Sequence, residues 1–149
     1  MSEAKLVKIP VHFWPVAVLS LLWNSFGGYD YVMSRSRSID YLNQATADHA
    51  DVFLRWMDAL PVWNQIAWPI GVWGSLLGSL LLLIRSRHAA TAFLVSLIGA
   101  VISFASEFAV GLPAELETTA MKVMTVVILA AIALFWWYSR RMQASGVLR

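Results

Sequence analysis

The chain has 149 residues, of which 59% are hydrophobic and 13% are charged, and its formal net charge is +2 at pH 7. With a mean hydropathy of +0.65, it carries too little polar surface for a small water-soluble domain. Its basic residues form no contiguous patch, so no nucleic-acid partner is predicted, and the absence of cysteine excludes disulfides and thiolate metal sites. The composition therefore predicts a protein that lies in the lipid bilayer.

Four stretches without acidic or basic residues have the length needed to cross a bilayer, which takes roughly 20 residues. They predict an all-α fold with a single integral membrane domain over residues 1–149. The domain is a four-transmembrane-helix bundle with a short amphipathic helix in the first outer loop. The first stretch lacks a small-residue cleavage site, so we expect it to stay in place as a signal anchor. The predicted spans are residues 11–33, 61–84, 89–110 and 118–138.

The amphipathic helix is predicted from the loop between the first two spans. Thr46 is a candidate N-cap there, and Ala50, Phe53, Leu54 and Met57 share one helical face. Such a helix lies on the membrane or caps the bundle. The alternative is a solvated loop helix without a function.

Lys and Arg are unevenly divided between the two sides of this arrangement. Both termini and the middle loop share one side, and the positive-inside rule places that side in the cytoplasm of a bacterial inner membrane. All acidic residues except Glu3 fall on the outer side. The basic residues of the cytoplasmic side are Lys5, Lys8, Arg85, Arg87, Arg140, Arg141 and Arg149.

Small residues follow one face in each of the first three spans. They let helix backbones approach closely, which matters because lipid gives apolar side chains little reason to prefer a neighbouring helix. The fourth span has no such stripe, and we expect it to be the most exposed to lipid. The predicted packing positions are Gly27, Gly28, Gly71, Gly74, Gly78, Ser96, Gly99 and Ser103.

Polar side chains gather near the outer ends of the spans. Placing an ionisable group at the bilayer centre costs about 2.5 kcal/mol or more, so the presence of Asp30 and Glu107 within the predicted spans requires an explanation. One explanation is a polar pocket that opens outward, in which Lys122 is the nearby counter-charge of both carboxylates. The alternative is that both carboxylates reach interfacial water, with Lys122 as a snorkelling neighbour or a structural ion-pair partner. The predicted pocket is lined by Asn24, Asp30, Tyr31, Asn64, Gln65, Glu107 and Lys122.

No catalytic or cofactor pattern is found in the sequence. His12 and His88 lie near the inner boundary on different spans, which formally permits a two-histidine haem, but both have the position of boundary residues and not of ligands facing into a bundle. No metal-ligand spacing, catalytic serine arrangement or phosphate loop occurs. We therefore expect no enzymatic activity, no cofactor and no metal.

Two segments carry a resemblance to a known family. Residues 23–31 read W-N-x-x-G-x-x-D-Y, and residues 73–85 read W-G-x-x-x-G-S-L-L-L-L-x-R. Together with W-Y-S-R-R at residues 137–141, they resemble a family of small bacterial four-span membrane proteins whose members are often labelled sugar transporters or left uncharacterised. The resemblance covers nearly the whole chain and implies the four-span fold.

Two functions are compatible with these observations. The first is transport of a small, sugar-type solute by a homo-oligomer, because four helices alone scarcely enclose a pathway. The second is an accessory, stabilising or assembly subunit of a larger inner-membrane complex. The family label favours the first. The second is favoured because the inner half of the bundle offers only Ser20, Ser75, Ser79 and Ser96 as polar groups.

Overall fold

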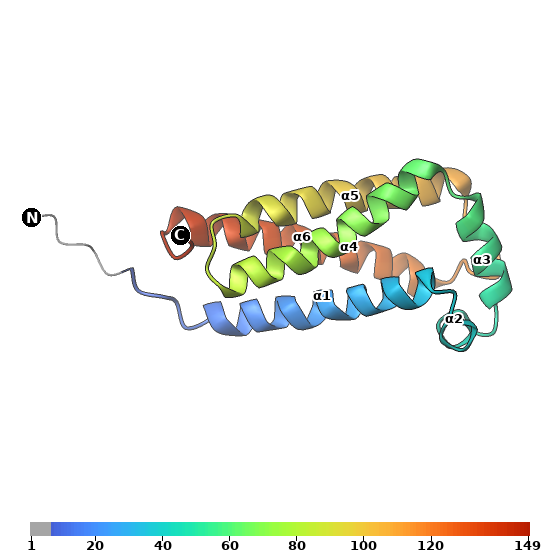
Figure 1. Ribbon diagram of the computed structural model, residues 1–149, viewed down its shortest axis with the longest axis horizontal. Helices are drawn as coiled ribbons and strands as arrows, with labels where there is room; N and C mark the ends of the chain where they lie inside the picture. Colours follow the sequence, from blue (N-terminus) through green and yellow to red (C-terminus); the bar gives the residue numbers. More distant parts are fainter. Residues whose placement is uncertain (1–6) are drawn as a thin grey trace, which may run out of the picture.

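The computed structural model describes residues 7–149, and over that range the chain forms helices and no strands. The four long helices lie side by side in an elongated bundle, and the two short ones cover one end (Figure 1). The predicted all-α class is confirmed. The helices are α1 (Phe13–Arg35), α2 (Ile39–Thr46), α3 (Ala50–Ala59), α4 (Val62–Leu83), α5 (Ala89–Val110) and α6 (Thr119–Ala144).

Three of the described helices, α4, α5 and α6, are long and apolar enough to cross a membrane. Helix α1 is not among them, so the predicted four-span bundle is not confirmed. Its 23 residues would reach roughly 34 Å at about 1.5 Å per residue, which is long enough. Ser20, Asn24 and Asp30, however, lower its hydropathy. Helix α6 also differs from the prediction, because it continues beyond residue 138 to Ala144.

Helices α4 and α5 pack through glycines that leave no room for a side chain. A Cβ atom at Gly99 would lie 2.9 Å from both the carbonyl oxygen of Ala67 and the backbone nitrogen of Gly71. A Cβ atom on α4 would meet atoms of α5 at 3.2 Å from Gly71, 3.1 Å from Gly74 and 2.9 Å from Gly78. The distances at Gly99 and Gly78 are shorter than real Cβ contacts, and those at Gly71 and Gly74 are shorter than most. The two backbones are therefore close at Gly71, Gly74 and Gly99, whereas Gly78 makes room for the Phe93 ring.

The glycines of α1 behave differently. A Cβ atom at Gly28 would make an ordinary contact of 3.7 Å with the side chain of Leu76 on α4. At Gly27 it would meet nothing within 4 Å. The expectation that Gly27 is a packing position is therefore corrected: it neighbours Gly28 in the sequence but lies a helical step away from the contact face.

The segment between α1 and α4 holds two helices where one was predicted. Thr46 ends α2 and does not cap α3, because the chain reverses at Ala47 and Asp48, whose φ angles are 50° and 66°. The N-cap position of α3 is His49. Helix α2 was missed because it is only eight residues long, and Leu42 is its one buried residue.

The opposite end is basic and closed by the C-terminal residues. We call it the basic end, and the end covered by α2 and α3 the capped end. The backbone nitrogen of Arg149 donates to the Arg85 carbonyl at 2.8 Å, and that of Arg87 donates to the Arg149 carbonyl at 2.8 Å. Val147 and Leu148 are buried beside Phe13, Leu82, Phe93 and Met142. The cations of the basic end are Lys8, Arg85, Arg87, Arg140, Arg141 and Arg149.

We expect Gly99→Ala to lower the stability of the folded chain in detergent by about 1–3 kcal/mol, because the added methyl group would meet backbone atoms of α4 that cannot move aside. The matched control is Gly27→Ala, which has open space for a Cβ atom and gains up to about 1 kcal/mol of helix propensity. Thermal unfolding followed by circular dichroism compares the two variants. Equal unfolding temperatures would show that α4 and α5 do not meet at Gly99.

Candidate functional site

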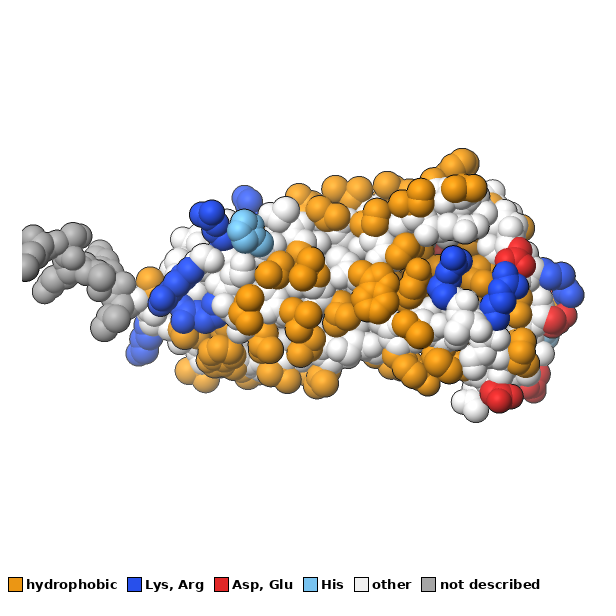
Figure 2. Space-filling model, in the orientation of Figure 1, with side chains coloured by type: hydrophobic (Ala, Val, Ile, Leu, Met, Phe, Trp, Pro, Cys, Tyr) orange, Lys and Arg blue, Asp and Glu red, His pale blue; other side chains and the backbone are white. Residues whose placement is uncertain are grey.

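The surface of the bundle is divided by polarity. Figure 2 shows hydrophobic side chains along its length and charged side chains gathered at its two ends. On this face the basic end carries Lys and Arg, while the capped end carries both signs of charge. Large apolar side chains such as Leu22, Val126 and Leu134 are more than 60% exposed between the ends. A bilayer around the middle of the bundle would surround all of these apolar side chains with hydrocarbon.

Inside the bundle, a polar network joins α1 to α4. The hydroxyl oxygens of Ser20 and Ser79 lie 2.6 Å apart, and the Asn24 amide donates to Ser79 Oγ at 2.8 Å. The same amide donates to the Ser20 carbonyl at 3.0 Å, and the Ser79 hydroxyl donates to the Ser75 carbonyl at 3.0 Å. All four residues are buried. Such bonds hold helices together where water cannot compete.

A second polar group, the Glu107 cluster (Asn64, Ser103 and Glu107), joins α4 to α5 nearer the capped end. The Asn64 amide donates to the Ser103 carbonyl and hydroxyl oxygens, both at 3.0 Å. The Ser103 hydroxyl donates in turn to Glu107 Oε1 at 3.2 Å. Asn64 is 1% exposed, whereas Glu107 is only partly buried. The Asn64 amide is therefore the buried part of the cluster, and the Glu107 carboxylate lies at its partly exposed edge.

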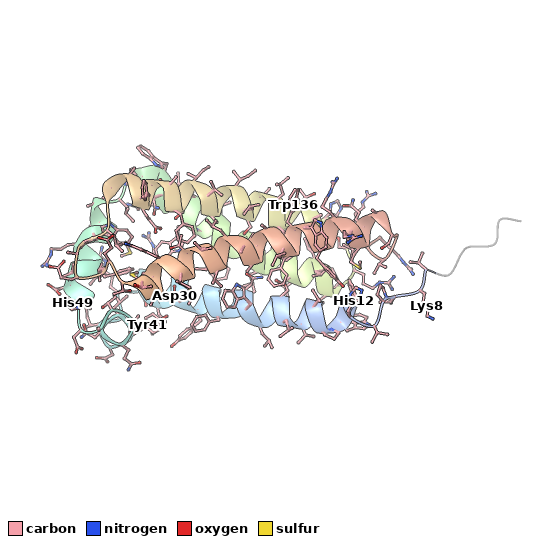
Figure 3. The ribbon with its side chains drawn as sticks, turned by 180° about the vertical axis from the view of Figure 1, so that it is seen from behind. Lys8, His12, Asp30, Tyr41, His49 and Trp136 are labelled. Carbon is pink, nitrogen blue, oxygen red and sulfur yellow. The ribbon has the colours of Figure 1, made fainter. Side chains whose placement is uncertain are left out.

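Asp30 is engaged by the short helix α2. The Tyr41 hydroxyl donates to Asp30 Oδ1 at 2.5 Å, and the ring of Tyr41 lies edge-on to Tyr29 at 5.6 Å (Figure 3). Burial, followed by the nearby Asp30 carboxylate, raises the pKa of the Tyr41 phenol. No sequence pattern singles out Tyr41, because its partner Asp30 lies on another helix. This contact fastens α2 to α1.

Lys122 pairs with a loop residue and not with the span carboxylates. Its ammonium group lies 2.7 Å from Glu117 Oε1, and this contact lowers the pKa of the exposed Glu117 carboxyl. Thr118 caps α6 by accepting from the Met121 backbone nitrogen at 3.2 Å. Lys122 therefore lies one turn after the cap, beside the loop. The expectation that it balances Asp30 and Glu107 is corrected.

The seven residues of the predicted outward pocket do not converge. Asn24 contacts Ser79, which lies roughly 22 Å further along α4 than Asn64 at about 1.5 Å per residue. Tyr31 packs edge-on against Trp68 and Trp73, with ring centroids at 4.9 and 5.9 Å. Gln65 is exposed. The single pocket is replaced by separate contacts, and only Asn64 and Glu107 of the seven share a cluster, through Ser103.

Tryptophan and ion-pair contacts hold α3 across the capped end. The Trp56 indole donates to the Gly111 carbonyl at 2.8 Å, and Arg37 forms an ion pair with Asp58. Trp63, in the first turn of α4, donates to Ser106 Oγ at 2.8 Å. The capped end is therefore closed by contacts of α3 with the loop after α5 and with the turn between α1 and α2, and by a contact of α4 with α5.

No metal or cofactor site stands out among residues 7–149: no three His, Asp or Glu side chains lie close enough to hold a metal ion. His12 Nδ1 lies 2.8 Å from the Tyr138 hydroxyl, linking α1 to α6. His88 is the exposed N-cap residue of α5. Each histidine is thus placed at the start of a helix.

These observations define the class of the protein: a helical bundle with three helices of membrane-spanning character, whose buried polar side chains bond to one another and to backbone carbonyls. No protein-family model, curated protein or solved structure matches the chain.

We expect Tyr41→Phe to remove one late-titrating phenol. Because burial, followed by the Asp30 carboxylate, raises the pKa of Tyr41 above the ordinary value of 10.0, the neutral phenol favours the folded state fully below pH 10, and this contribution is lost as the pH rises through the higher folded value. Alkaline titration followed by ultraviolet absorbance of the phenolate compares the variant with the parent chain. Identical late phases would place Tyr41 in open solvent.

Proposed function

We propose that the chain is a multi-pass protein of the bacterial cytoplasmic membrane in which α1 is the fourth span. Helix α1 has the length of a span and lies alongside the other three (Figure 1). Its polar residues Ser20 and Asn24 bond to α4, which reduces the cost of carrying them in hydrocarbon. The basic end faces the cytoplasm by the positive-inside rule, so both termini lie inside.

The function that this arrangement supports best is that of a non-catalytic accessory subunit, which stabilises or assembles a larger membrane complex. The observation that carries it is the pairing of buried polar groups. Within residues 7–149, the only buried side-chain nitrogen or oxygen atoms without a hydrogen-bond partner are Arg85 Nη2 and Ser139 Oγ, both towards the basic end. A solute pathway needs polar groups that are free to face water along the whole depth. This bundle uses its polar groups to join helices.

Helix α6 offers the surface for a partner. Only 6% of its apolar stretch is buried, against 33% for α4 and for α5. Its main packing neighbour is α5, which leaves one long face uncovered. The spacing of the exposed residues, i, i+3, i+7, i+11 and i+14, places them in a single stripe. We call it the α6 stripe: Val123, Val126, Ala130, Leu134 and Trp137.

We expect Ala130→Trp, in the middle of the α6 stripe, to disrupt this association, because a large ring there would hold a neighbouring helix away. The measurement is purification from native membranes in polymer-bounded lipid discs. A different polypeptide should accompany the parent chain at a fixed ratio and be lost from the variant.

The matched control is Ala105→Trp, at another exposed alanine, on α5. It should keep the partner at the parent ratio. A parent chain that purifies alone, or only with copies of itself, would contradict the accessory function.

The second candidate function is transport of a small, sugar-type solute by a homo-oligomer. Glu107 favours it, because among residues 7–149 no ion pair involves this carboxylate, although it lies within α5. The resemblance to four-span proteins labelled sugar transporters favours it as well. A second copy of the chain would have to complete the pathway.

If that function holds, Glu107→Gln should abolish uptake coupled to protons or cations, since the amide keeps the shape of the side chain but not its charge. Flux into proteoliposomes measures this. Ser106→Ala, which loses the bond from Trp63 and the bond to the Ile102 carbonyl but leaves Glu107 in place, is the control and should transport normally. Uptake by Glu107→Gln equal to that of the parent chain would remove the carboxylate from any transport step.

A further inference from the structure

Helices α1 and α6 border a cleft on the outside of the bundle. Helix α1 packs mainly on α4, and α6 mainly on α5, so the two have little backbone contact with each other although they run side by side (Figure 3). At the basic end the cleft is bridged by His12 Nδ1 and the Tyr138 hydroxyl, 2.8 Å apart, whose rings meet edge-on at 5.7 Å. This hydrogen-bonded pair closes the bottom of the cleft at the basic end, and the rest of the cleft is open.

The part of the cleft nearer the middle of the bundle is purely apolar. A hollow of about 270 Å³ is lined by Leu19 and Trp23 of α1 and by Val127, Ala131 and Phe135 of α6. Leu19 is 62% exposed and Trp23 is 36% exposed, so the hollow opens outward. Its lining matches the hydrocarbon of a lipid chain and offers nothing to a polar solute.

The part of the cleft at the basic end is both polar and cationic. A larger hollow of about 770 Å³ is lined by His12, the N-cap residue of α1, by Trp137, Tyr138 and Arg141 of α6, and by Ser145, the C-cap residue of α6. The guanidinium carbon of Arg141 lies 5.0 Å from the centre of the Trp137 ring, which holds the cation at the mouth. Among residues 7–149, no carboxylate forms an ion pair with Arg141.

The two hollows lie along one line. His12, Leu19 and Trp23 are spaced i, i+7 and i+11 and so share a face of α1. From Val127 to Arg141, α6 rises roughly 21 Å at about 1.5 Å per residue. That is on the order of one leaflet of a bilayer, half of a hydrocarbon core of about 30 Å plus its headgroup layer. The polar hollow would thus lie at headgroup depth and the apolar one at chain depth.

We infer that the α1–α6 cleft binds one anionic phospholipid of the cytoplasmic leaflet. The phosphate lies at Arg141, whose guanidinium presents a fork of donors that suits phosphate oxygens. His12, Tyr138 and Ser145 contribute further hydrogen-bonding groups around the headgroup. One acyl chain runs along Phe135 and Ala131 towards Trp23. The inference depends on the bilayer insertion proposed above but not on the partner subunit.

The full-length chain, purified in dodecyl maltoside and stripped of lipid, tests the inference. Native mass spectrometry with added phosphatidylglycerol should show a one-lipid adduct at occupancy about tenfold above that with phosphatidylcholine. Arg141→Gln should lower the phosphatidylglycerol adduct about tenfold, since hydrogen bonds to a charged group are lost. The adjacent, exposed Arg140→Gln should change it less than about twofold. Equal losses in both variants would indicate diffuse attraction and overturn the site.

A second pair of variants tests the apolar half of the cleft. Ala131→Trp fills the apolar hollow and should displace the lipid, whereas its neighbour Ala130→Trp projects from the α6 stripe and should leave the adduct unchanged. Both variants must melt within a few degrees of the parent chain for the comparison to hold, and Arg141→Gln decides the case if Ala131→Trp does not fold. Retention of the lipid by folded Ala131→Trp would overturn the acyl-chain position.

Other occupants give different results in the same experiment. If inorganic phosphate raises the melting temperature of the stripped chain as much as phosphatidylglycerol does, the polar hollow binds a free anion and the lipid assignment fails. An adduct with the mass of a second chain, lost in Ala131→Trp, would assign the cleft to a dimer contact. The partner test with Ala130→Trp is independent, so the accessory function and the lipid site can fail separately.

Discussion

The close approach of α4 and α5 is the contact on which the rest of the bundle depends. In lipid, an apolar side chain gains little by leaving one hydrocarbon neighbour for another, so helices need backbone proximity and hydrogen bonds to associate. Gly99 lets α5 meet the α4 backbone beside Ala67 and Gly71. Ser96 then donates to the Gly71 carbonyl at 2.5 Å, a bond that only this proximity permits. Helix α1 joins the outside of α4, and α6 joins the outside of α5.

How far the sequence predicts this structure depends on whether a feature is local. The apolar runs of α4, α5 and α6 are visible in hydropathy alone, and the spacing of Gly71, Gly74 and Gly78 indicates a contact face. The partners of polar residues are not local. Asn24 had Asn64 and Asp30 as equally plausible neighbours, and only the register of α1 on α4 places it at Ser79. Lys122 likewise had acids on several segments within reach.

Helix α6 presents three different faces, and this division gives the bundle separate surfaces. Ile132 and Ser139 face the interior and are buried. Ala131 and Phe135 face the cleft beside α1. The α6 stripe lies on the remaining side, around Ala130. The proposed lipid and the proposed protein partner can therefore bind to different faces of α6. Trp137 is the one residue that belongs to both the α6 stripe and the cleft.

The hydrogen bonds from Ser20 and Asn24 to Ser79 have a consequence for how the chain enters the membrane. Helix α1 leaves the ribosome long before α4, so during synthesis its amide and hydroxyl have no interhelical partner. A segment of this modest hydropathy then has a weak preference for the bilayer over the translocation channel. On the proposal that α1 is the fourth span, its stable insertion is coupled to the arrival of α4, and the two helices enter the membrane together. The order of synthesis and the order of insertion into lipid would then differ.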